Sequence, residues 1–176
     1  GSGLVGSEMC IRDSAPIAGV QIANYNCPGQ IVISGKKEAV EEAGAKLKEA
    51  GAKRVLPLKV SGPFHSDMLT GAGEKLGKVL ETVKIQTPSI PYVANVTADY
   101  VTEAEMVKPL LMRQVSSSVR WEQSIRRMLE DGVDTFIEIG PGKTLTGFMK
   151  KIDRNANAMN IEKLEDIEKV KEALGC

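Results

Sequence analysis

Residues 54–83 have the sequence RVLPLKVSGPFHSDMLTGAGEKLGKVLETV, and this stretch decides how the middle of the chain folds. Apolar residues alternate over residues 54–60, as they do in a strand, and Gly62-Pro63 forces a turn after them. Beyond the turn, apolar residues recur every three or four positions. This spacing predicts a helix over residues 67–83, with Ser66 as its N-cap.

The turn between these two elements carries His65, the only histidine of the chain. An imidazole can accept and return a proton near neutral pH, and the end of a tight turn suits an active site. A single histidine is more often an ordinary surface or core residue. The position of His65 alone therefore leaves a structural and a catalytic role open.

The composition excludes several classes of function. The 176 residues include 23 Lys+Arg and 23 Asp+Glu, so no basic excess points to nucleic acid or a membrane surface. Aromatic residues make up only 4%, which argues against base stacking, and no apolar run approaches the roughly 18 residues of a membrane span. The three cysteines lack C-x-x-C spacing, and no carboxylate pair has the spacing of a metal site. We expect a cytoplasmic protein with free thiols, no metal and no cofactor.

The order of the predicted elements indicates an α/β protein. Strands over residues 20–25, 30–34 and 54–60, with a helix over residues 37–50, match the last two-thirds of a ferredoxin-like β-α-β-β-α-β unit. The first strand and helix of that unit are missing from the predicted elements. After residue 65, strands and helices alternate, which argues for a parallel α/β layer. The elements expected there are strands over residues 90–95, 135–139 and 158–161 and helices over residues 103–115, 121–131, 144–152 and 164–174.

The first 14 residues do not have the pattern of folded protein. They lack the order of charged and apolar residues of a secretory signal, and they resemble a translated adapter sequence. We therefore expect a non-native leader over residues 1–14, a partial ferredoxin-like subdomain over 15–60 and the C-terminal part of an α/β core over 61–176. On this interpretation the natural chain continues upstream, and the sequence is a truncated piece.

Two further patterns bear on chemistry. The run Gly140-Pro141-Gly142-Lys143-Thr144 follows a predicted strand and opens a helix, but it lacks the glycines that the Walker and dinucleotide patterns need. A tight strand-to-helix turn is favoured over a phosphate site. The nucleophile elbow G-x-S-x-G occurs nowhere in the sequence, and Cys27, in a turn after a strand, is a weak alternative partner for His65.

Five short runs occur in the order that is typical of one enzyme family: ANYNCPGQIVISG at residues 23–35, GAKR at 51–54, GPFHS at 62–66, RQ at 113–114 and EIGPGK at 138–143. Through these runs the chain, over about residues 15–164, resembles the malonyl-CoA:acyl carrier protein transacylases of bacterial fatty acid synthesis. The resemblance implies the remnant of an α/β-hydrolase-like, parallel-sheet acyltransferase core plus the partial ferredoxin-like subdomain.

The resemblance also implies a reaction and its residues. A serine would attack the thioester of malonyl-CoA, His65 would take its proton, and the malonyl group would pass to the phosphopantetheine thiol of acyl carrier protein. The backbone carbonyl of Gln114 would hold the other ring nitrogen of the histidine. Asn24 and Asn26 would line the substrate cleft, and the bulk of Phe64 would exclude an α-methyl branch.

Three parts of the family's pattern would lie upstream of this chain: the elbow serine, the arginine for the malonyl carboxylate and the oxyanion-hole glutamine. We therefore expect the chain alone to be inactive, and we expect exposed edges and apolar faces to favour self-association. A second interpretation is a non-catalytic module that docks an acidic carrier protein, although its basic residues are more often ordinary solvated charges. The residues in question are Arg126, Arg127, Lys150 and Lys151.

Overall fold

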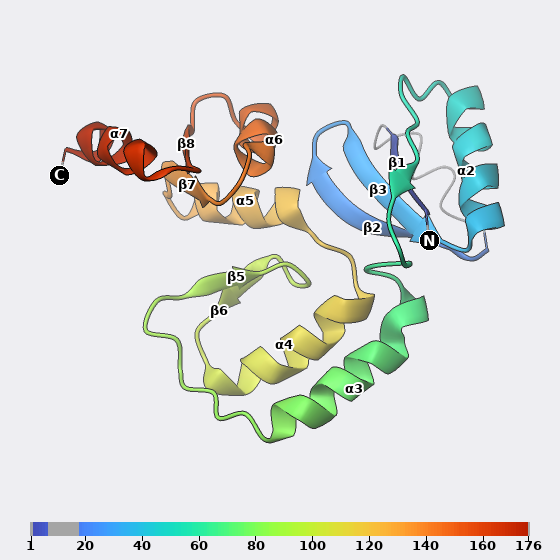
Figure 1. Cartoon of the computed structure of the whole chain (residues 1–176), viewed down its shortest axis with the longest axis horizontal. Helices are drawn as coiled ribbons and strands as arrows, with labels where there is room; N and C mark the ends of the chain where they lie inside the picture. The colour runs from blue at the N-terminus through green and yellow to red at the C-terminus, as the bar shows by residue number, and fades with distance from the viewer. Residues whose placement is uncertain (1, 7–17, 176) are drawn as a thin grey trace. The chain divides into compact units, whose positions relative to one another are not determined.

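The computed structural model describes residues 2–6 and 18–175. The chain divides into two compact units, Gly1–Ser124 and Ile125–Cys176 (Figure 1). We expected a boundary after residue 60, and the division found here lies much further along the chain.

The elements of the first unit are β1 (Ser2–Gly6), β2 (Val20–Cys27), β3 (Gln30–Gly35), α2 (Lys37–Glu49), β4 (Leu58–Lys59), the 3-10 helix η1 (Asp67–Leu69), α3 (Thr70–Glu81), β5 (Tyr92–Ala94), β6 (Asp99–Val101) and α4 (Ala104–Ser116). Helix α5 (Trp121–Glu130) begins at the end of the first unit. The second unit continues with β7 (Thr135–Ile139), α6 (Thr144–Ile152), β8 (Asn157–Ile161) and α7 (Leu164–Leu174). The expected helices are present within a few residues of their predicted bounds.

The first four strands form an antiparallel sheet in the order β2-β3-β1-β4. Strand β1 pairs with β3 at Leu4↔Ile33 and with β4 at Gly3↔Leu58. It therefore supplies the first strand that we expected the ferredoxin-like unit to lack. Pairing between distant residues makes this strand, since a short run with two glycines has no local strand pattern.

Strand β1 also corrects part of the expectation for the first 14 residues. Residues 2–6 belong to the sheet, although the sequence pattern placed them in a leader outside the fold. Residues 7–14 of that expected leader lie outside the described residues.

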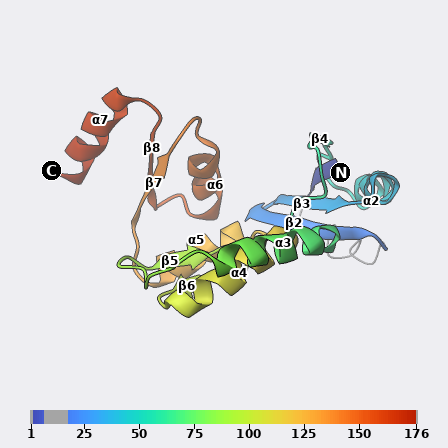
Figure 2. The ribbon, with the colours of Figure 1, turned by 60° about the horizontal axis from the view of Figure 1, so that its bottom comes forward.

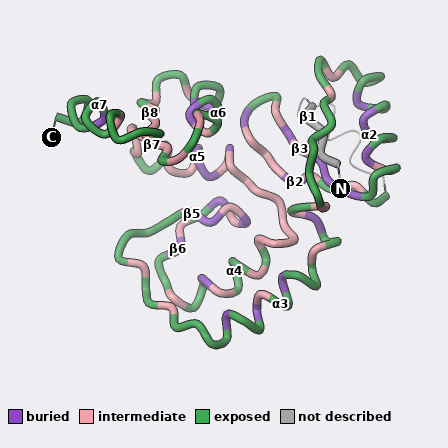
Figure 3. Tube along the Cα trace, in the orientation of Figure 1, coloured by how far each residue is buried: buried purple, intermediate pink, exposed green. Residues whose placement is uncertain are grey.

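Helix α2 covers one face of this sheet, and the buried side chains between them form a hydrophobic core (Figure 3). Val40, Ala43 and Leu47 are spaced so that they share one side of the helix, and all three are buried against Ile31 and Ile33 of β3. Burial of each large aliphatic side chain contributes about 1.5–3 kcal/mol, so this small core fixes β3 and its neighbour β2. The helix thereby supports the strand that lines the candidate site.

The strand expected over residues 54–60 is much shorter in the structure. Only Leu58–Lys59 pairs, at the edge of the sheet and with both residues exposed. Pro57 precedes this pair and has no backbone N–H to donate, which explains why the ladder does not extend toward residue 54.

Helices α3 and α4 lie side by side in the first unit (Figures 1 and 2). Their contact is unusually close, because a Cβ atom added at Gly73 would lie 2.8 Å from the carbonyl oxygen of Met112. A glycine at this position lets the two backbones approach. The end of α4 therefore lies near the start of α3, where His65 is found.

The strand expected over residues 90–95 does not lie in a parallel layer among the described residues. Tyr92–Ala94 pairs instead with β6 in an antiparallel hairpin, and its turn closes through hydrogen bonds from the N–H groups of Thr97 and Ala98 to the Ala94 carbonyl. A local turn of this kind brings neighbouring strands together without a crossover. The hairpin buries Val101 against Val107 of α4.

The second unit holds a parallel pair of strands joined by a helix, as the sequence predicts. Strands β7 and β8 pair in register from Thr135↔Asn157 to Ile139↔Ile161, and α6 connects them. Helix α7 follows and contacts β8. None of the helices in the described part of the chain is long and apolar enough to cross a membrane.

Candidate active site

His65 adopts a backbone conformation that few residues other than glycine tolerate. Its φ angle is +57°, in the left-handed region, and its side chain is half-buried. Such a conformation costs on the order of 1 kcal/mol and persists only where the surroundings hold it. Histidine is one of the residue types enriched there. Of the two non-glycine residues with a positive φ in the described part of the chain, His65 and Ala98, one is thus the residue that the sequence singles out.

The turn around His65 is closed by Ser66, in a way that the sequence did not predict. The Ser66 hydroxyl donates to the carbonyl oxygen of Pro63 at 2.6 Å, and it makes no side-chain cap to the helix. Ser66 is thus the N-cap residue of η1, as predicted, but the expected side-chain cap is not formed, because the tight turn places the Pro63 carbonyl within reach of the hydroxyl. The first helical N–H, that of Asp67, is instead bound by Oε1 of Gln21 at 2.6 Å.

The imidazole of His65 meets the end of helix α4. Its Nδ1 lies 3.0 Å from the carbonyl oxygen of Gln114, a residue 49 positions further along the chain. A carbonyl oxygen can only accept a hydrogen bond, so in the neutral ring the proton lies on Nδ1 and the lone pair of Nε2 is left free. His65 and Gln114, the pair that the family resemblance implies, are thus in direct contact.

The position of the Gln114 carbonyl is fixed by the segment that follows α4. Residues 117–119 run along strand β2, where Val119 N–H donates to Ala23 O and Tyr25 N–H donates to Val119 O, both at 2.8 Å. The Ser118 hydroxyl adds a bond of 2.5 Å to the carbonyl of Ile22. These contacts hold the end of α4 against the sheet.

Sequence reasoning missed this segment. Three consecutive serines, residues 116–118, follow Arg113-Gln114, and such residues bind nearby backbone groups. That signal predicts polar contacts but not their partner, because Ile22 lies 96 positions away from Ser118.

A cavity of about 480 Å³ opens beside His65. Strand β2 lines it with Gln21, Ile22 and Tyr25, and the serines at residues 116–118 line another part. Apolar side chains and hydroxyl groups meet in it, so a small acyl group and its polar atoms could both be accommodated.

The three expected substrate-binding residues do not line this cavity in the part of the chain that the structure describes. Asn24 and Asn26 both belong to strand β2 and are half-buried. The backbone of Asn24 forms an isolated β-bridge with Val119. The side chain of Phe64 is 49% exposed next to His65. Cys27, the alternative nucleophile, is buried at the end of β2 and also lies outside the cavity lining.

The glycine-rich loop after β7 is held by an internal carboxylate. Oε2 of Glu138 accepts the N–H and the hydroxyl of Thr146 at 2.8 and 2.7 Å, and Oε1 accepts the N–H of Leu145 at 3.1 Å. Burial alone would raise the pKa of Glu138, but these hydrogen bonds outweigh it and hold the pKa below its usual value of 4.5. The donors at the start of α6 are thus engaged by the protein itself, which supports the prediction of a structural turn.

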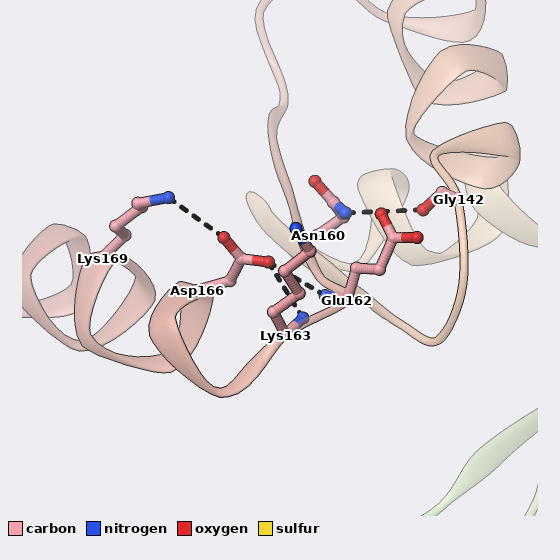
Figure 4. Close-up of polar contacts among 6 residues, drawn as sticks. All are labelled: Gly142, Asn160, Glu162, Lys163, Asp166 and Lys169. Atoms are coloured by element: carbon pink, nitrogen blue, oxygen red, sulfur yellow. Dashed lines mark hydrogen bonds and ion pairs between the residues drawn. The ribbon is translucent and has the colours of Figure 1, made fainter.

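Figure 4 shows four further contacts of the second unit, three of them to Asp166. Nδ2 of Asn160 donates to Gly142 O at 3.4 Å and so ties the loop to β8. Asp166 caps helix α7 by accepting the N–H groups of Glu162 and Lys163 and the Nζ of Lys169. These contacts stabilise the second unit.

Among the basic residues considered for carrier docking, Arg127 has ordinary surroundings. Arg127 forms an ion pair of 2.5 Å with Asp131, four positions further along, and both side chains are more than a third exposed. Pairs of this kind are common on solvated helices and contribute little.

The family profile described as "Acyl transferase domain" matches residues 3–170. The chain belongs to this family. Over 149 residues it is 50% identical to the "Malonyl CoA-acyl carrier protein transacylase" of Bacillus subtilis (strain 168), a match that covers 85% of this chain and 47% of that protein. The chain thus spans about half the length of the curated relatives it matches. The resemblance found in the sequence is confirmed.

Solved structures support the same conclusion for the fold. The acyl-carrier-protein S-malonyltransferase of Bartonella henselae matches with a TM-score of 0.92 and 36% identity, over 99% of this chain and 58% of that one. A malonyl-transacylase solved in complex with a type II polyketide synthase acyl-carrier protein matches with a TM-score of 0.93 and 37% identity, over 98% and 58%. The fold of the chain is that of a portion of the malonyltransferase structure.

Proposed function

We propose that this chain carries the histidine half of the catalytic site of a malonyl-CoA:acyl carrier protein transacylase. The observation that supports this most directly is the 3.0 Å contact between Nδ1 of His65 and the carbonyl oxygen of Gln114. The contact leaves Nε2 free to act as a base, in a chain that belongs to the acyl transferase family.

The proposed reaction proceeds in two transfers. Nε2 of His65 takes the proton of a serine hydroxyl while the serine oxygen attacks the malonyl thioester carbon, and the coenzyme A thiolate leaves with the proton from His65. His65 then takes the proton of the phosphopantetheine thiol of acyl carrier protein, whose sulfur attacks the malonyl-serine ester. The serine leaves as the alcohol once His65 returns the proton. The Gln114 carbonyl replaces the carboxylate of a Ser-His-Asp triad in orienting the ring.

The substrate residues belong to this proposal as well. The proposed substrate-binding residues are Asn24 and Asn26 on β2 and Phe64, whose exposed aromatic ring directly precedes His65 in the chain. An acyl carrier protein is the proposed acceptor, and a related transacylase was solved in complex with one. The proposed location of the reaction is the cytoplasm.

A hybrid protein tests the role of His65. It joins the part of the Bacillus subtilis transacylase that the match leaves out to residues 2–176 of this chain, so that β1 is kept. We expect it to convert malonyl-CoA and holo acyl carrier protein to malonyl carrier protein, measured by mass spectrometry. His65→Asn tolerates the left-handed backbone but supplies no base, so we expect a loss of about 100-fold or more. Undiminished transfer by the variant contradicts the proposal.

The chain by itself provides a second test. Because the 176 residues contain no nucleophile elbow, incubation with malonyl-CoA should leave the intact mass of the chain unchanged. A stable increase by one malonyl group would show that the chain holds its own nucleophile.

A further inference from the structure

A side-chain contact from strand β2 holds the turn that carries His65. Oε1 of Gln21 accepts the N–H of Asp67 at 2.6 Å, across 46 positions of sequence. This N–H belongs to the first residue of η1, where no earlier helical carbonyl is available to bind it. The contact therefore fixes the chain two residues beyond His65.

The hydrogen-bond partner of His65 is tied to the same strand. Ile22, Ala23 and Tyr25 bind the segment that follows Gln114 through Ser118 and Val119. Four residues within positions 21–25 of β2 thus hold the His65 turn on one side and the end of α4 on the other. On the Gln114 side two backbone hydrogen bonds contribute, which substitutions other than proline leave in place, whereas on the His65 side the contact depends on the side chain of Gln21.

We propose that Gln21 is a positioning residue for His65: by accepting the Asp67 N–H it keeps the turn in the conformation that directs Nδ1 to the Gln114 carbonyl. The inference builds on the proposed role of His65 as a base. His65 is strained at φ +57°, and a strained residue keeps its conformation only while neighbouring contacts hold it. The side chain of Gln21 is exposed, so its contribution is this hydrogen bond rather than core packing.

The experiment uses the chain itself and its single histidine. In 15N-labelled protein, the imidazole 15N shifts report which ring nitrogen carries the proton, without interference from other histidines. We compare the wild type with Gln21→Met, which keeps the length of the side chain but removes the oxygen, and with Gln21→Glu, which restores an acceptor. Thr82→Val is the matched control, because it removes a side-chain-to-backbone bond of α3 (Thr82 Oγ1 to Val79 O, 2.9 Å) far from this turn.

We expect the wild type, Gln21→Glu and Thr82→Val to carry the neutral-ring proton on Nδ1. In Gln21→Met the share of this tautomer should fall, and hydrogen exchange of the Asp67 amide should rise by about fivefold. Melting temperatures should agree across the set, since Gln21 is exposed. A wild-type tautomer and wild-type Asp67 exchange in Gln21→Met overturn the proposal, and so does a failure of Gln21→Glu to restore them.

These outcomes are separate from the test of the proposed function. If the hybrid with His65→Asn keeps its transfer activity, His65 is not the base, whatever the tautomer in Gln21→Met. If His65→Asn abolishes transfer while Gln21→Met leaves the tautomer unchanged, the base is correct and Gln21 does not position it.

Discussion

Gly73 of helix α3 lies so close to Met112 of helix α4 that a Cβ atom at position 73 would be 2.8 Å from the Met112 carbonyl oxygen. Backbone atoms cannot move aside as a flexible side chain can. The neighbouring Gly77 faces the same residue differently, because a Cβ there would meet the Sδ and Cε atoms of the Met112 side chain. The two glycines therefore have the same partner but different tolerance for an added methyl group.

Alanine substitutions in α3 should separate these two cases. Alanine in place of a helical glycine gains about 0.5–1 kcal/mol, whereas overpacking costs about 1–3 kcal/mol. We expect Gly73→Ala to lower the free energy of unfolding by about 1–2 kcal/mol and Gly77→Ala to change it by less than about 1 kcal/mol. Gly71→Ala, with nothing within 4 Å, should be neutral or stabilising. Denaturation of the first unit can be followed by the fluorescence of the single tryptophan, Trp121. A Gly73→Ala protein as stable as Gly71→Ala would contradict the close contact.

Glu138→Gln should destabilise the second unit in a pH-dependent way. Its carboxylate accepts three hydrogen bonds at the start of α6, and bonds of this kind and the helix dipole together suggest a loss of about 1–2 kcal/mol at pH 7. Because the pKa of Glu138 is lowered in the folded state, its contribution is present above the ordinary value of 4.5 and is lost as the pH falls below it. The difference between wild type and variant should therefore shrink at pH 3.

Denaturation of the second unit, followed by the methyl signal of the buried Met149, measures this difference. Thr146→Ser is a suitable control, because it keeps the hydroxyl that bonds to Glu138. A stability difference that is the same at pH 7 and pH 3 would show that the charge of Glu138 does not contribute.

Lys169→Met should raise the pKa of Asp166. The hydrogen bond from Lys169 is the largest cause that lowers this pKa, from 3.8 to about 2, followed by the N–H groups of Lys163 and Glu162 (Figure 4). Since the folded-state pKa is depressed, ionised Asp166 stabilises α7 above about pH 3.8, and this contribution is lost as the pH falls through about 2. The carboxyl 13C titration of Asp166 measures the shift. Lys171→Met, which removes a bond to Glu168 instead, should leave the midpoint unchanged.

Local patterns were sufficient for most helices and for the parallel pair. Helix α2 follows from the spacing of Val40, Ala43 and Leu47, and strands β7 and β8 follow from an apolar run on each side of a helix. The short strands were harder. Nothing in the run Ser2–Gly6 shows that it pairs with β3, because a strand with no periodicity is made by its partners rather than by its own residues.

The site shows the same division between local and distant information. The sequence located His65 in a turn, and the family resemblance supplied Gln114 as its partner. The sequence could not reveal that Gln21 binds the turn beyond His65 or that Ser118 ties the segment after Gln114 to β2. Both contacts join residues that lie far apart in the chain. The sequence predicted Ser66 correctly as the N-cap residue but not the partner of its hydroxyl, because the Pro63 carbonyl comes within reach only in the folded turn.

Phe64 provides the last prediction, which concerns acyl selectivity. Its aromatic side chain is 49% exposed and precedes the half-buried His65. The ring therefore does not belong to the hydrophobic core. In the hybrid protein, Phe64→Ala should remove the steric barrier to an α-methyl group and raise the ratio of methylmalonyl to malonyl transfer by about tenfold or more. Phe64→Tyr keeps the bulk and should leave the ratio unchanged. Competition between the two coenzyme A thioesters, with both carrier products resolved by mass, gives the ratio directly. Because the ring is exposed, its removal should leave the fold intact. Equal selectivity in the alanine variant and the wild type would therefore mean that another part of the cleft excludes the methyl branch.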